Sequence, residues 1–189
     1  MAQLEIQHHA KQMTVEAFWD WCDLPENADR LFELYDGEII EKTPSFEPSE
    51  IAITIGAFIK FYLLQNPIGR LSGADGTYKM SDTRSYIPDV AYISKARMPD
   101  TPKRGVLVPP DLAVEVMSPT DSKRQLRLKA ERYIELGTQL VWLVFPDTQQ
   151  VEVYHDANDV LTVGIAGLLE GYAVLPGFTL AVSAIFVTI

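Results

Sequence analysis

Two acidic residues stand inside apolar runs of the chain, where a carboxylate is costly. Asp89 lies in the run over residues 87–93, and Glu115 lies in the run over residues 112–117. Both runs are short and rich in β-branched residues, so we predict that each forms a buried strand. A buried carboxylate needs a counter-charge or a metal ion. A divalent cation shared by Asp89 and Glu115 meets that need, and oxygen ligands of this kind favour magnesium or manganese.

A charged helical pattern follows the second run and supplies a candidate cation. Residues 118–121, with a serine before a proline and an acid three residues on, predict a helix start. Lys129 lies about 80° from the centre of the apolar face that contains Leu126 and Tyr133. We therefore expect Lys129 to border the buried face, from which its ammonium can reach the strand that carries Glu115.

Each of these three residues also has a purely structural interpretation. Asp89 could cap a strand, and Lys129 could extend its aliphatic stem along the helix surface. Glu115 could pair with an arginine of the same helical segment, such as Arg127 or Arg132. The residue types alone leave both interpretations open.

The order of the motifs resembles the PD-(D/E)xK nuclease superfamily, and within it the Uma-type restriction endonucleases. The similar positions are residues 32–38, residues 87–91, residues 111–119, Lys129, Tyr133, Gly137 and Trp142. The resemblance implies a restriction-endonuclease-like α/β (α+β) fold, in which helices flank a central mixed sheet and an N-terminal β-hairpin precedes it. It implies a magnesium- or manganese-dependent endonuclease acting on DNA. Asp89, Glu115 and Lys129 would be catalytic, and the carbonyl of Val116 would join the two acids as a metal ligand.

The chain departs from the family pattern at positions that matter for activity. The commonest superfamily lysine stands two residues after the second acid, where this chain has Met117, whereas Lys129 stands where Uma-type relatives carry a helix lysine. Relatives often carry a histidine at the start of the helix, near the position of Glu50. Glu50 could hold a metal-bound water, or it could be there because an acid in the first turn interacts favourably with the helix dipole. These departures leave an alternative: a nuclease-fold protein that cuts weakly or not at all and serves as a nucleic-acid-binding or regulatory subunit.

The remaining elements follow from periodicity and turn residues. Asp36 and Gly37 between alternating runs predict a β-hairpin. This hairpin carries Glu33 and Glu38, either of which could face the site or solvent. An apolar pattern predicts a largely buried helix over residues 50–65. Further predicted elements are a helix capped by Thr14, a bent strand over residues 69–81, a long basic loop over residues 95–110, and strands over residues 140–145, 151–155 and 160–165.

Length and composition bound the class of protein. The 189 residues, of which 47% are hydrophobic, suit one globular domain over residues 1–189. No apolar run approaches the ~20 residues of a membrane helix, and the N-terminus, with Glu5, His8 and His9, lacks the apolar segment of a secretory signal. We therefore expect a cytoplasmic protein. The single Cys22 excludes an internal disulfide and a cysteine-based zinc site.

The acidic composition of the chain bears on the partners that it can bind. A net charge of −10 counts against non-specific binding of nucleic acid over the whole surface, although basic residues cluster at 95–104 and 123–132. Cutting both DNA strands needs two sites, so we expect a homodimer. The apolar residues 174–186 pack either on the body of the protein or on a second subunit, where they would be a candidate contact. The sequence contains no nucleophile elbow and no histidine partner, so it gives no support to a small-molecule hydrolase.

Overall fold

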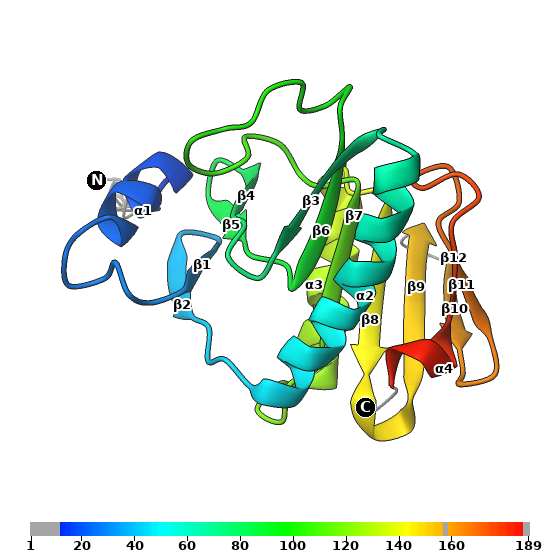
Figure 1. Cartoon of the computed structure of the whole chain (residues 1–189). Helices are drawn as coiled ribbons and strands as arrows, with labels where there is room; N and C mark the ends of the chain where they lie inside the picture. The colour runs from blue at the N-terminus through cyan, green and yellow to red at the C-terminus, as the bar shows by residue number, and fades with distance from the viewer. Residues whose placement is uncertain (1–11, 157–158, 187–189) are drawn as a thin grey trace, which may run out of the picture.

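The computed structural model describes residues 12–156 and 159–186, and within them the chain forms four α-helices and sheets of six, four and two strands (Figure 1). The segment with Glu5, His8 and His9 lies outside the described residues. In chain order the elements are α1 (Val15–Cys22), β1 (Phe32–Tyr35), β2 (Glu38–Glu41), α2 (Phe46–Gln65), β3 (Gly69–Gly73), β4 (Tyr78–Ser81), β5 (Arg84–Tyr86), β6 (Val90–Ser94), β7 (Leu112–Val116), α3 (Lys123–Glu135), β8 (Leu140–Phe145), the 3-10 turn η1 (Pro146–Thr148), β9 (Gln150–Asp156), β10 (Asp159–Val163), β11 (Leu168–Glu170), β12 (Thr179–Ala181) and α4 (Val182–Ile185).

The six-stranded sheet is mixed, and α2 and α3 cover its two faces (Figure 1). Its strand order is β10-β9-β8-β7-β6-β3, with β7 and β8 parallel and every other pair antiparallel. The predicted fold class is therefore confirmed.

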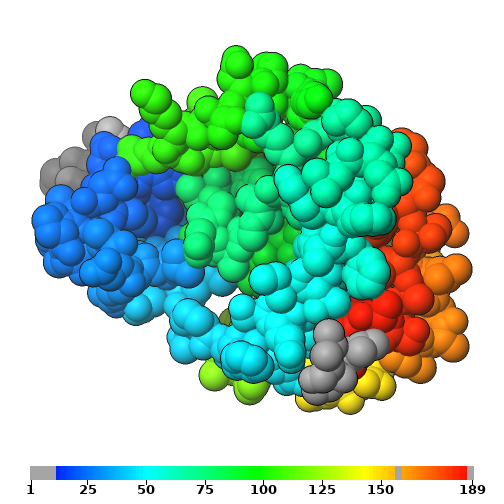
Figure 2. Space-filling view, viewed as in Figure 1, coloured from blue at the N-terminus to red at the C-terminus, as the bar shows by residue number. Residues whose placement is uncertain are grey.

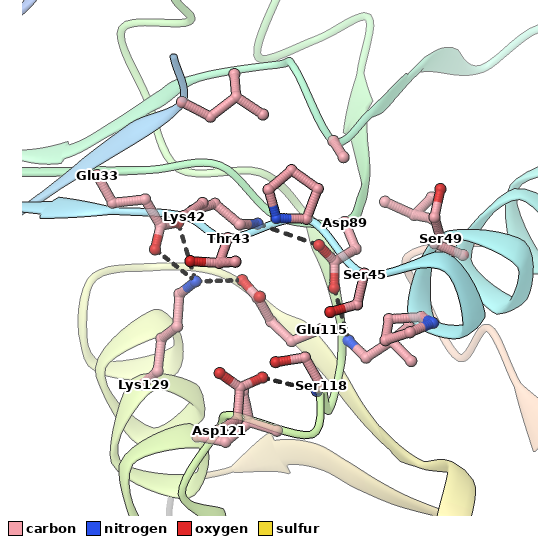
Figure 3. A pocket seen from close by; sticks show the side chains of 18 of the residues that line it. Glu33, Lys42, Thr43, Ser45, Ser49, Asp89, Glu115, Ser118, Asp121 and Lys129 are labelled. Atoms are coloured by element: carbon pink, nitrogen blue, oxygen red, sulfur yellow. Dashed lines mark hydrogen bonds and ion pairs between the residues drawn. The ribbon is translucent and has the colours of Figure 1, made fainter.

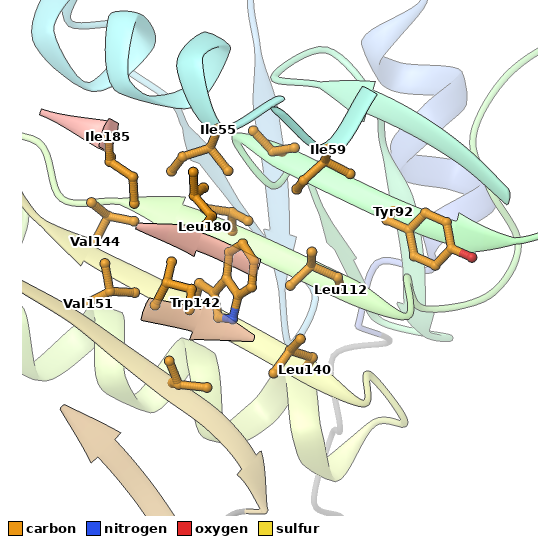
Figure 4. Close-up of a cluster of buried hydrophobic side chains, with 14 of the residues drawn as sticks. Ile55, Ile59, Tyr92, Leu112, Leu140, Trp142, Val144, Val151, Leu180 and Ile185 are labelled. Atoms are coloured by element: carbon orange, nitrogen blue, oxygen red, sulfur yellow. The ribbon is translucent and has the colours of Figure 1, made fainter. Parts of the chain in front are cut away.

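Side chains alternate along the central strands and build a different core on each face. In β7, Leu112 and Val114 pack beneath α2, whereas Ala113 packs beneath α3. Figure 4 shows the α2-side core, in which Trp142 of β8 lies among the aliphatic side chains. By this alternation Glu115 falls on the α3 side of the sheet, although it stands in a strand that is buried throughout.

The predicted hairpin is confirmed and belongs to the four-stranded antiparallel sheet, of order β2-β1-β5-β4. Its turn needs two left-handed residues, and Asp36 and Gly37 adopt φ values of 52° and 85°. Helix α1, capped by Thr14 as predicted, packs Phe18 against the hairpin residues Phe32 and Leu34.

The prediction for α2 was wrong in two respects. The helix begins at Phe46 rather than at residue 50, because Pro48 fits a first helical turn, where no amide donor is required. It is also not largely buried: Ile53, Phe61 and Leu64 are 72%, 66% and 71% exposed. Apolar residues surround the whole circumference of this helix, but the sheet covers only one side of it.

Three other boundaries differ from the prediction. Helix α3 begins at Lys123, whereas residues 118–121 form a turn in which the Ser118 amide donates to Asp121 Oδ2 at 2.8 Å. The strand predicted over residues 69–81 is two strands, β3 and β4, in different sheets. Asp89 precedes β6 instead of lying inside it.

The apolar C-terminal residues pack on their own chain. Leu175, Phe178 and Leu180 are buried in the α2-side core together with Ile185 of α4. These side chains are therefore not the free surface on which the expected dimer contact was based. Among the described helices, none is long and apolar enough to cross a membrane.

Candidate active site

A cavity of about 930 Å³ opens between the hairpin, the first half of α2, and the ends of β7 and α3. Figure 2 shows the molecule hollowed between the hairpin segment and the first turns of α2. Among the charged side chains that line this cavity, five from distant parts of the sequence bear on the proposed site (Figure 3): Glu33, Lys42, Asp89, Glu115 and Lys129. The structure thus brings together the three residues predicted as catalytic, with Glu33 and with one lysine that the sequence did not single out.

Lys129 is a buried lysine that contacts two of these carboxylates. Its Nζ lies 2.9 and 3.1 Å from the two carboxylate oxygens of Glu33 and 2.8 Å from Glu115 Oε1. The residue is only 7% exposed, so it lies within the buried face of α3 rather than at its border. Burial works against its charge, but Glu115 and Glu33 outweigh burial and hold the pKa of Lys129 well above its usual value. The two carboxylates therefore favour the charged form of Lys129.

Glu115 meets Lys129 and a tyrosine at the same oxygen. The Tyr133 hydroxyl donates to Glu115 Oε1 at 2.7 Å. Burial raises the pKa of Glu115 to about 7, although Lys129 and Lys42 act in the opposite direction. The pairing with Arg127 considered above is wrong, because Arg127 binds Glu152 at 2.6 Å. In the described part of the chain, no hydrogen bond reaches Oε2 of Glu115.

Glu33 holds the ammonium of Lys129 from the hairpin side. Its Oε1 also accepts the Ile87 amide at 2.6 Å, and its Oε2 accepts the Tyr35 hydroxyl at 2.8 Å. Burial opposes ionisation of Glu33, but Lys129 outweighs burial and lowers its pKa. Of the two hairpin acids, Glu33 therefore faces the site, whereas Glu38 is exposed.

Asp89 is held at the cavity rim by one lysine and one backbone amide. Lys42 Nζ lies 3.1 Å from Asp89 Oδ1, and the Val116 amide donates to Asp89 Oδ2 at 2.8 Å. Lys42 also donates to the Ile87 carbonyl at 2.7 Å. Sequence reasoning missed Lys42, since it ends an alternating run in which a charged residue is ordinary.

Glu50, the other acid considered for the site, is not brought to the cavity. It is exposed on α2 and is not among the side chains that line the cavity, although the neighbouring Ser49 is. The geometry therefore gives Glu50 no contact with Asp89 or Glu115.

The donor set suits a hard divalent cation bound by few protein ligands. Across the described residues, no group of three or more His, Cys, Asp or Glu side chains is arranged to hold a metal ion. Magnesium, however, is commonly bound by only one or two carboxylates and keeps several waters. Asp89 and Glu115, with Val116 beside them in the cavity lining, provide such a set. Three carboxylates face two ammonium groups here, which leaves one formal negative charge for a bound cation.

Comparison with known proteins agrees with this architecture. A family model described as "Uma2: Putative restriction endonuclease" matches residues 15–183. No protein of curated function matches the chain. Among solved structures, the chain is similar to "a putative nuclease belonging to DUF820" from Anabaena variabilis ATCC 29413. The two are 24% identical, the match covers 92% of this chain and 97% of that one, and the TM-score is 0.79. At this identity the likeness supports the fold.

Proposed function

Because the chain belongs to the Uma2 family ("Putative restriction endonuclease"), we propose that it is a magnesium- or manganese-dependent endonuclease that hydrolyses phosphodiester bonds of DNA. The observation that carries the proposal is the Lys129 ammonium, held 2.8 Å from Glu115 Oε1 in the cavity whose rim carries Asp89. Carboxylates such as these can hold a divalent ion for the hydrolysis of a phosphate ester, and a cation beside them can stabilise the charge that develops.

Each residue has a role in this proposal. Asp89, Glu115 and the carbonyl of Val116 would hold the metal ion. When bound, the ion supplies a nucleophilic water and neutralises charge that develops on the phosphate. The Lys129 ammonium, which lies beside Glu115, would orient the attacking water and stabilise the negative charge that develops on the phosphate. Glu33 keeps the ammonium of Lys129 in place.

DNA as substrate must be reconciled with a net charge of −10. The basic residues of α3 lie beside the cavity, and Arg132 lines it. Local positive charge at that position can attract a phosphate backbone even though the whole protein is acidic. We therefore expect binding that weakens steeply with added salt.

The direct test is cleavage of supercoiled plasmid by the full chain with magnesium or manganese. We expect nicked or linear product with either ion, no product in a chelator, and at least about a 100-fold slower reaction for Asp89→Asn. Wild type that leaves the plasmid intact with every divalent ion would remove the catalytic proposal.

One observation favours a second candidate function, a nuclease-fold protein that binds nucleic acid without cutting it. Both proposed metal ligands already carry a lysine partner, Lys42 on Asp89 and Lys129 on Glu115. If Lys42 stays on Asp89 when divalent ions are present, Asp89 cannot serve as a metal ligand. This candidate predicts a salt-dependent gel shift of DNA with no cleavage product.

We also propose that the active form is a homodimer, since cutting both strands requires two sites. The apolar C-terminal residues do not supply the contact, because they are buried in their own chain. Light scattering at micromolar concentration should give twice the chain mass of 21.2 kDa, and a monomer mass at all concentrations would exclude the dimer.

A further inference from the structure

Lys42 occupies the part of the cavity in which a metal ion would meet Asp89. Its ammonium lies 3.1 Å from Asp89 Oδ1, and it is held there by the Ile87 carbonyl. Figure 3 shows the Lys42 side chain reaching from the hairpin segment toward Asp89. Glu115, the other proposed metal ligand, lines the same cavity as Lys42 and Asp89. The ammonium therefore stands in the field of both proposed metal ligands.

The two lysines of the cavity are held in different ways. The side chain of Lys129 is 8% exposed and makes three contacts with buried carboxylates, whereas the side chain of Lys42 is 22% exposed and touches one carboxylate oxygen. The backbone of Lys42 is anchored, because its amide donates to the Leu31 carbonyl at 2.9 Å. Only the flexible stem and ammonium of Lys42 would have to move, and solvent is within reach of that stem.

We propose that Lys42 is a tethered cation that neutralises Asp89 in the metal-free protein and is displaced when the divalent ion binds. This inference rests on the proposed metal site at Asp89 and Glu115. In the absence of metal, the lysine reduces the repulsion between the carboxylates of Asp89 and Glu115. It also lowers the affinity for the metal ion, because an incoming ion must break the Lys42–Asp89 pair. The same charge makes the cavity select a divalent ion, since a monovalent ion gains too little to replace an ammonium that is covalently attached nearby.

The test is manganese binding by the full-length protein, followed from the paramagnetic resonance signal of free manganese, with no substrate present. Lys42→Met removes the charge and keeps the stem. Lys42→Gln also removes the charge but retains an amide donor for the Ile87 carbonyl, which protects folding if Lys42→Met unfolds. Lys60→Met is the matched control, because Lys60 lines the same cavity but makes no ion pair with the residues that the structure describes.

We expect one manganese ion per chain and at least about tenfold tighter binding in both Lys42 variants, which corresponds to about 1.4 kcal/mol. Binding by Lys60→Met should stay within about threefold of wild type. Binding confined to the Lys42 variants would contradict the displacement, because the lysine would then exclude the ion altogether.

Two further results would overturn the tethered cation and leave the metal site standing. One is manganese binding by the Lys42 variants that is no tighter than binding by wild type. The other is an equal gain in affinity in Lys60→Met, which would indicate that any positive charge lining the cavity weakens binding. A failure of every protein to bind manganese would overturn the proposed metal function together with this inference.

Discussion

Lys129 Nζ lies 2.8 Å from Glu115 Oε1 and 2.9 Å from Glu33 Oε1, so one ammonium joins α3 to β7 and to the hairpin. All three side chains are at most 8% exposed. If the ammonium is removed, water cannot replace it, because both carboxylates are buried. The same contact therefore contributes to the proposed chemistry and to the stability of the fold. Variants of these residues have to be judged by both properties.

The first prediction concerns Lys129→Met. The substitution leaves two buried carboxylates without their shared cation, and breaking a buried pair in this way costs about 3–5 kcal/mol of unfolding free energy. Cleavage by the fraction that remains folded should fall by about 100-fold or more, the effect of losing one positioned charge. Urea denaturation and plasmid cleavage measure the two effects.

Lys123→Met is the control for this variant. Lys123 lies exposed in the first turn of α3 and makes no ion pair among the described residues. Its replacement should change the unfolding free energy by less than about 1 kcal/mol. Equal stability of Lys129→Met and wild type would mean that the buried ion pair is not formed in solution.

The second prediction concerns Glu33 as a positioning residue. Glu33→Gln keeps the shape of the side chain but removes one of the two negative charges on Lys129. We expect a loss of about 1–3 kcal/mol of unfolding free energy and cleavage at least about tenfold slower, with manganese affinity changed by less than about threefold. The control is Glu38→Gln, on the exposed side of the same hairpin. A large change of manganese affinity in Glu33→Gln would make Glu33 a metal ligand instead.

The third prediction concerns the acid stability of the fold through Asp111, far from the proposed chemistry. Burial opposes its ionisation, but the Arg97 guanidinium at 2.8 Å and the Ser94 amide at 2.7 Å outweigh burial and lower its pKa below the ordinary 3.8. The folded state therefore binds this proton less readily than the unfolded state. The resulting stabilisation is complete above about pH 4 and is lost as pH falls through the lowered folded pKa.

Asp111→Asn tests this assignment. At neutral pH the variant should be less stable by about 1.5–3 kcal/mol, the range for hydrogen bonds to a charged group. The difference from wild type should shrink as pH falls below about 4, as measured by urea midpoints at several pH values. A difference that stays constant with pH would show that the Asp111 charge contributes nothing.

The site acids were predictable because their positions conflict with their surroundings. Asp89 and Glu115 stand out as carboxylates in apolar runs, and the Asp-Gly pair fixed the hairpin by its backbone requirement. Lys42 carries no comparable signal. Its partner Asp89 lies 47 residues further along the chain. The two residues come together because β1 pairs with β5, and no local sequence pattern specifies that pairing.

Burial was the property that local periodicity predicted least well. Helical angle put Lys129 at the edge of its apolar face, but the hairpin closes over that edge through Glu33 and makes it interior. Conversely, the uniformly apolar sequence of α2 does not indicate which side the sheet will cover, and Phe61 remains 66% exposed. Both outcomes depend on contacts between elements that are distant in sequence.

The most direct measurement of the central claim is anomalous diffraction from crystals of the full chain soaked in manganese. We predict one anomalous peak about 2.0 to 2.3 Å from carboxylate oxygens of both Asp89 and Glu115, with Lys129 still bound to Glu33 and the Lys42 ammonium withdrawn from Asp89. A map with no peak at that position, and with Lys42 still paired to Asp89, would contradict the metal site and the nuclease mechanism built on it.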